Sequence, residues 1–207
     1  MKFFSRNRLL FKAICVSFTI CMIFSMIPFE SECQSISEDV FRLHILANSD
    51  SNEDQALKLC VRNAVLDYAN NLYKNSKSKQ ESIKLTKENL SSIIAIAQKT
   101  VREKGYDYKV TAKITNMYFN TRYYENITMP SGMYDALQIK IGSGEGHNWW
   151  CVMYPSLCLS SGVKSEELDK ALTDEQKNIV DGEKNYVVKF KVVEYYEKLI
   201  SFFKGEK

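Results

Sequence analysis

The segment VFRLHILA, residues 40–47, determines the fold that we predict for the rest of the chain. In a strand, the apolar residues Phe41, Leu43 and Ile45 would lie on one face. The polar residues Arg42 and His44 would lie on the other. Alternation with a period of two is typical of a strand with one buried face. The next residues, NSDSNEDQ (48–55), hold the start signal of a helix, because Ser51 can cap it and Asp54 follows three residues later. The chain is therefore predicted to pass directly from a strand into a helix.

Two long amphipathic helices are expected next. The first begins at Ser51 and ends near residue 74, with apolar residues three and four positions apart. The second follows the polar break 74–80 and ends at Gly105. Its inner stripe consists of Ile83, Leu90, Ile93, Ile94, Ala97 and Val101.

The later part of the chain returns to strand periodicity. Residues 106–115 and 133–141 alternate between apolar and polar side chains, as half-buried strands of an antiparallel sheet do. Residues 165–186 predict short helices and loop, and 187–204 predict a terminal helix. We therefore expect an α+β fold with two layers: a mostly antiparallel sheet, two long amphipathic helices on one face, and a C-terminal helix. The other face is predicted to be solvated and basic, with Arg42, His44, Lys109, Lys113 and Lys140.

Residues 1–33 are predicted to be a signal peptide or an N-terminal membrane anchor. Basic residues precede the apolar run 13–27, and Pro28 is expected to break any helix there. Cleavage after Cys33 would release residues 34–207 as a single extracytoplasmic α+β domain. Without cleavage, residues 9–27 would anchor the domain to the membrane.

The net charge argues against one class of partner, and the cysteines suggest a disulfide. A formal net charge of +3 over 207 residues is too small to indicate nucleic-acid binding. Of the six cysteines, Cys151 and Cys158 are candidates for a disulfide in an exported protein. The alternative is that both are small buried apolar residues, and Cys60 is expected at a core position of a helix.

The segment GSGEGHNWWC (142–151) gathers residue types that often carry chemistry, but it fits none of the usual sites. It lacks the Gly-Lys-Ser/Thr ending of a phosphate-binding loop, so its glycines are predicted to turn the chain in a hairpin. On a strand, His147 and Cys151 would lie about 13 Å apart, too far for a nucleophile and its base. The two histidines and the acidic DSNED stretch (50–54) match no metal-site spacing. No catalytic residue, metal or cofactor is predicted.

The strand expected from residue 148 has two apolar faces. Trp149, Cys151 and Met153 share one face, and Trp150, Val152 and Tyr154 share the other. Either both faces are covered, or one aromatic row is exposed as a surface for a partner.

Two segments resemble the stage II sporulation protein R family of endospore-forming bacteria. They are FRLHILANSDSNEDQALKLCVRNAVL (41–66) and GMYDALQIKIGSGEGHNWWCVMYPSLC (132–158), and the likeness spans essentially the whole body. The paired signatures ANSDS (47–51) and GHNWWC (146–151) are specific to that family. Ser156 stands where the family usually has a second proline.

The resemblance implies a protein that is exported into the space between forespore and mother cell. There it would activate a membrane-bound aspartic protease that processes the precursor of sigma-E, and it would not itself be an enzyme. Alternatives are a secreted cysteine-dependent hydrolase and a cell-wall glycan-binding module. Contact with the protease or with the membrane surface is predicted for Trp149, Trp150, Tyr154, His147, Arg42 and Lys140.

Overall fold

A mixed sheet forms the centre of the computed structural model, which describes residues 2–124, 127–155, 172–181, 189–192 and 194–195. The strand order is β2-β5-β1-β6. β1 (Phe41–Leu46) pairs in parallel with β5 (Gly132–Ile141) and antiparallel with β6 (Asn148–Tyr154). β2 (Val110–Phe119) pairs antiparallel with β5. The predicted α+β class with a mostly antiparallel sheet is confirmed.

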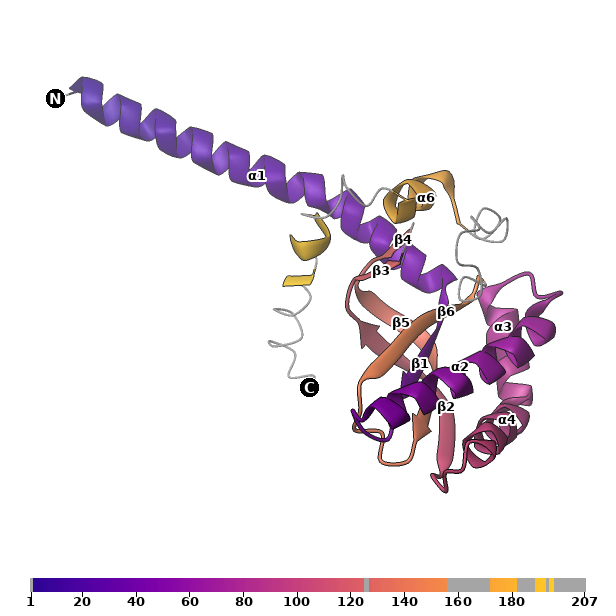
Figure 1. The fold of residues 1–207 in the computed structure, drawn as a ribbon. Coiled ribbons are helices and arrows are strands. Elements are labelled where there is room, and N and C mark those ends of the chain that lie inside the picture. The colour runs from indigo at the N-terminus through magenta and orange to yellow at the C-terminus, as the bar shows by residue number, and fades with distance from the viewer. Residues whose placement is uncertain (1, 125–126, 156–171, 182–188, 193, 196–207) are drawn as a thin grey trace.

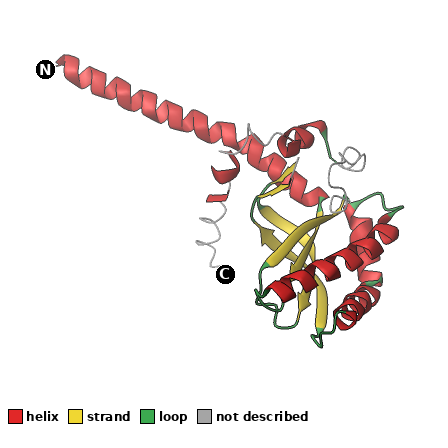
Figure 2. Ribbon diagram, in the orientation of Figure 1, coloured by secondary structure: helices red, strands yellow, loops and turns green. Residues whose placement is uncertain are grey.

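Three helices cover one face of this sheet (Figure 1, Figure 2). They are α2 (Asn52–Tyr73), α3 (Lys79–Glu88) and α4 (Leu90–Glu103). The predicted cap is confirmed, because the Ser51 hydroxyl accepts a hydrogen bond from the Asp54 amide at 3.1 Å. The first core lies between these helices and the sheet, and its fully buried members include Leu43, Ile45, Val61, Ile93 and Ile139.

Asn89 divides the second predicted helix into α3 and α4. Its backbone leaves the helical region (φ −107, ψ 13), and its side-chain amide donates to the Leu85 carbonyl at 2.9 Å. The Tyr68 hydroxyl donates to the Asn89 side-chain oxygen at 3.1 Å. Asparagine competes with the backbone for hydrogen bonds in this way and so ends helices, although the apolar stripe continues across the break.

Helix α1 (Lys2–Asp39) passes through Pro28, so the prediction that Pro28 breaks the helix is wrong. A proline inside a helix costs about 3 kcal/mol. The turns after Pro28 offset this cost because they pack into the fold, where Phe29, Cys33 and Ile36 are buried. Among the described residues, no helix combines the length and the apolar character needed to cross a membrane.

A second core lies on the other face of the sheet. It joins the end of α1 to α6 (Asp174–Asp181) and to the ribbon of β3 (Arg122–Tyr124) and β4 (Ile127–Met129). Its buried members include Phe119, Tyr134, Val152, Ile179 and Phe190.

The prediction of a solvated basic face is therefore wrong for two of its residues. Arg42 is 0% exposed and His44 is 3% exposed, because β1 is a central strand with cover on both faces. Lys109, Lys113 and Lys140 are exposed as predicted. Of the predicted terminal helix (187–204), residues 189–192 and 194–195 are helical, and the rest lies outside the described residues.

Candidate functional site

Two loops that are far apart in the sequence meet where β1 ends. Residues 47–51 connect β1 to α2, and residues 142–147 connect β5 to β6; we call their contact the two-loop junction. The Gly146 amide donates to the Ala47 carbonyl at 3.0 Å, and the Glu145 amide donates to the Asn48 carbonyl at 3.3 Å. The Ser143 amide and hydroxyl donate to the side-chain and backbone oxygens of Asn48 at 3.0 and 2.6 Å.

The glycine-rich loop is not the predicted hairpin, because β1 lies between β5 and β6. The loop instead crosses the end of β1. Gly142 has a φ of +58 and Gly144 a φ of +64, so both glycines turn the chain in a conformation that other residues rarely adopt. Gly146 serves close approach instead, since a Cβ on it would lie 2.1 Å from the Ser49 carbonyl oxygen.

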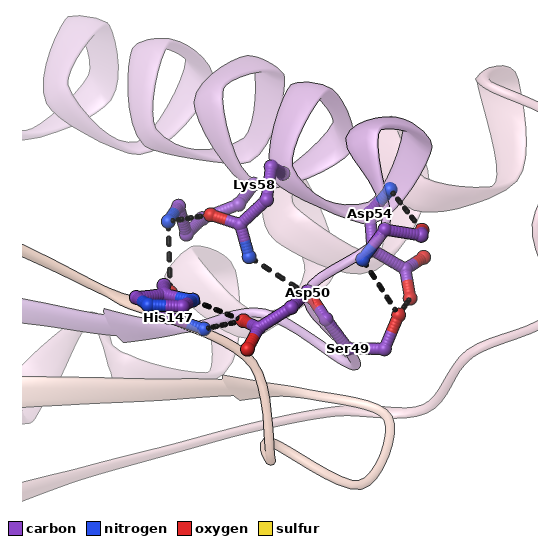
Figure 3. Close-up of polar contacts among 7 residues, drawn as sticks. Ser49, Asp50, Asp54, Lys58 and His147 are labelled. Atoms are coloured by element: carbon purple, nitrogen blue, oxygen red, sulfur yellow. Dashed lines mark hydrogen bonds and ion pairs between the residues drawn. The ribbon is translucent and has the colours of Figure 1, made fainter.

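Asp54 holds the first loop against the start of α2 (Figure 3). Its carboxylate accepts hydrogen bonds from the Asn48 side-chain amide at 2.9 Å and from the Ser49 hydroxyl at 2.6 Å. Burial acts to raise the pKa of Asp54, but these hydrogen bonds outweigh it, and the pKa lies below its ordinary value. The carboxylate is therefore ionised at neutral pH and fixes the loop.

Lys58 ties the second loop to the same helix. Its ammonium group donates to the His147 carbonyl at 2.8 Å and to the Gln55 side-chain oxygen, and Gln55 in turn donates to the Ser49 carbonyl at 2.9 Å. Burial lowers the pKa of Lys58 from its ordinary value, since the side chain is largely shielded from water.

The outer side of the junction carries a hydrogen-bonded pair of side chains, Asp50 and His147. The Asp50 carboxylate contacts both the backbone amide and Nδ1 of His147. The side chains are 56% and 80% exposed, respectively. Hydrogen bonding from His147 holds the pKa of Asp50 below its ordinary value. The junction thus presents the Asp50 carboxylate, hydrogen-bonded to His147, to solvent on a closely packed base.

The two tryptophans are half-buried on opposite faces of β6 and do not form an exposed row. Trp149 packs against the first core, with the Arg62 guanidinium 4.4 Å from its ring centroid. Trp150 packs against the second core, where its ring stacks on His44 with centroids 4.0 Å apart. The Arg122 guanidinium lies 5.3 Å from the centre of the Trp150 ring.

Tyr154 lies on the opposite face from the one predicted. β1 pairs Arg42 with Val152 and then Phe41 with Tyr154, so Met153 is skipped. Such a bulge reverses the alternation of side chains. Tyr154 consequently packs against the first core instead of continuing the row of Trp150.

Arg42 and Lys140 are separated by the fold. The buried Arg42 guanidinium donates to the Tyr124 hydroxyl at 2.8 Å and lies 4.3 Å from the Phe119 ring centroid. It therefore belongs to the second core and not to a surface. Lys140 is exposed, and its side chain runs along Gly144, so it borders the junction.

Cys151 is disulfide-bonded, whereas Cys15, Cys21 and Cys60 are free thiols. The predicted partner, Cys158, and the atypical Ser156 lie outside the described residues. Pairing of Cys151 with Cys158 therefore stays a prediction. The part of the chain that the structure describes holds no cluster of His, Cys, Asp or Glu suited to a metal ion.

Sequence reasoning singled out His147 and Lys140 but missed Asn48, Asp50 and Lys58. The segment 48–55 indicated a helix start, and ANSDS (47–51) was a family signature, but neither assigned a role to these side chains. A further signal is the run of polar residues 48–50, which is longer than a cap requires.

Replacing Gly146 with alanine should disrupt the junction. The added Cβ would overlap the Ser49 backbone, so we expect the free energy of unfolding to fall by about 2–4 kcal/mol in urea denaturation. Gly105→Ala is the matched control, because Gly105 has a φ of +84 but nothing within 4 Å, and it should cost only about 1–2 kcal/mol. Equal effects of the two substitutions would show that the close approach is unimportant.

The pH dependence of stability should report His44. Burial lowers its pKa from 6.5 to about 4, with partial opposition from a hydrogen bond to Asn148. The unfolded chain binds this proton more tightly than the folded protein, so stability is full above pH 6.5 and is lost as the pH falls toward 4. At pH 5 the lowered pKa of His44 should reduce the free energy of unfolding by about 2 kcal/mol.

Urea denaturation between pH 7 and 5 measures this loss. His44→Gln should flatten the profile, while His147→Gln should leave the His44 contribution in place. If the free energy of unfolding falls with pH equally in His44→Gln and in the unmodified protein, His44 is not the source of the pH dependence.

Comparisons with known proteins place most of the chain in one family. The stage II sporulation protein R family matches residues 37–164, a range that includes both loops and all four strands of the main sheet. Stage II sporulation protein R of Bacillus subtilis (strain 168) is 37% identical over 152 residues, which are 71% of this chain and 67% of that relative. No solved structure matches the chain. The chain therefore belongs to the stage II sporulation protein R family, a family of sporulation signalling proteins.

Proposed function

We propose that this protein is an exported signal that activates a membrane-bound aspartic protease, which then processes the precursor of sigma-E. Family membership supports the signalling role. The observation that carries the proposal further is the two-loop junction. The two most family-like segments of the sequence, 47–51 and 146–151, converge there into one network with an exposed Asp50–His147 pair.

The junction is suited to recognition. Asp54 and Lys58 fix the loops from below, and Asp50 and His147 face solvent above them. A contact surface that already has its bound shape loses less conformational entropy when the partner binds. We therefore place the contact with the protease at Asp50, His147 and the bordering Lys140, outside the cytoplasm in the space between the two cells.

The alternative functions are less compatible with the same geometry. A cysteine hydrolase needs a thiolate, but Cys151 is disulfide-bonded and His147 is paired with Asp50. A glycan-binding platform needs open aromatic faces. The Trp150 ring stacks on His44, and Arg62 lies over the ring of Trp149.

Activation can be measured with the protease reconstituted in membrane vesicles together with the sigma-E precursor. The double variant Asp50→Asn/His147→Gln removes the carboxylate and the imidazole of the exposed pair. It should raise the concentration for half-maximal cleavage at least about tenfold, which corresponds to about 1.4 kcal/mol. Lys140→Gln should act in the same direction. Lys99→Gln on the outer surface of α4 is the control and should change nothing.

The melting temperatures of all variants should stay unchanged, because the replaced side chains are exposed. Full activation by the double variant at wild-type concentration would place the contact elsewhere on the protein. Failure of the unmodified protein to stimulate cleavage would reject the proposed function itself.

A further inference from the structure

Helix α1 has two halves with opposite environments. In its first half the large apolar side chains that the structure describes are exposed, among them Phe11 (68%), Phe18 (65%) and Phe24 (67%). After Pro28 the pattern reverses. One stripe is buried, consisting of Phe29 (5%), Cys33 (2%) and Ile36 (0%). The boundary between leader and folded domain in this structure thus falls between Phe24 and Phe29.

The second half of α1 is joined to three other parts of the fold. Phe29 packs on Phe190 with ring centroids 5.3 Å apart. The Gln176 side-chain amide, from α6, donates to the Ser35 hydroxyl at 2.8 Å and to the Asp39 carboxylate at 3.1 Å.

Lys79 at the start of α3 makes the third connection. Its ammonium group donates to the Ser37 carbonyl at 3.2 Å and pairs with the Asp135 carboxylate of β5 at 2.9 Å. The side chain of Lys79 is only 9% exposed, so this link between α1, α3 and the sheet lies inside the fold. Residues 29–39 therefore complete the domain on the face opposite α2 and α4.

We propose that processing of the leader, in which water hydrolyses one peptide bond, occurs N-terminal to Phe29 and leaves Phe29–Asp39 on the exported protein. A cut after Cys33 would instead remove two residues of the second core, Phe29 and Cys33, and would leave Ile36 without its neighbours on the stripe. The sequence offers Ser25 as a small residue before the boundary, of the type that precedes such cuts. The inference does not depend on the identity of the signalling partner.

The mass of the full-length chain after export from a Gram-positive host tests the proposal directly. An N-terminus between residues 26 and 29 supports it, and an exported chain that keeps its whole leader would contradict it. Cys33→Val should be cut at the same position as the unmodified protein. Ser25→Val should be cut less, so that a larger share of the protein keeps its leader. A product that begins at Gln34 and disappears in Cys33→Val would overturn the proposal.

Thermal unfolding of the exported protein supplies a second readout. Phe29→Ala should lower the melting temperature by about 6–12 °C, because it empties part of the second core. Phe29→Leu should lower it less, and it keeps the test usable if the alanine variant does not fold. Ser31→Ala, on the exposed side of α1, should leave the melting temperature unchanged. Unchanged melting of both Phe29 variants would show that residues 29–39 are not part of the domain.

Discussion

β1 is hydrogen-bonded on both edges and buried on both faces, and the remaining elements are arranged around this constraint. A hairpin joins only antiparallel strands, so β1 cannot be joined by hairpins to both of its neighbours. The β5–β6 connection must therefore cross the end of β1, where it meets the chain that leaves for α2. The two-loop junction is a consequence of this strand order, and Gly146 is required because the two backbones are in contact.

Burial of β1 on its second face places a cation inside the protein. A buried charge is costly unless its environment replaces the lost water. The Arg42 guanidinium lies 4.3 Å from the Phe119 ring centroid and 5.0 Å from that of Tyr134, and it donates to the Tyr124 hydroxyl. Arginine is suited to this role because its weakly hydrated plane stacks on aromatic rings. Arg42 thereby links β1 to β2, β5 and the β3–β4 ribbon.

Sequence patterns predicted the features that depend on neighbouring residues. The alternation in 40–47, the cap at Ser51 and the period-two strands all reappear in the structure because each is set by local geometry. The burial of Arg42 and His44 could not be predicted in the same way. Alternation separates the two faces of a strand, but it does not reveal whether a later segment, here α1 with the β3–β4 ribbon, will cover the polar one.

The same limit applies to the candidate site. Asn48 and Asp50 follow one strand, and His147 precedes another, some hundred residues later. Only the pairing of both strands with β1 or its neighbours brings these residues together, and pairing partners are not encoded in either segment alone. The continuation of α1 through Pro28 was missed for a related reason, since the packing that offsets the proline involves residues as distant as Phe190.

Within the junction, burial separates residues that hold the fold from residues available to a partner. Asp54 and Lys58 are 4% exposed, and each bonds across loops, so their loss would leave buried groups unsatisfied. Asp50 and His147 are mostly exposed, and solvent screens such a pair, so the fold gains little from it. The Asp50–His147 pair therefore adds little to the stability of the fold, although the closely packed loops beneath it hold it in place. This division fits the recognition role proposed for the junction, because the shape is fixed from below while Asp50 and His147 face solvent.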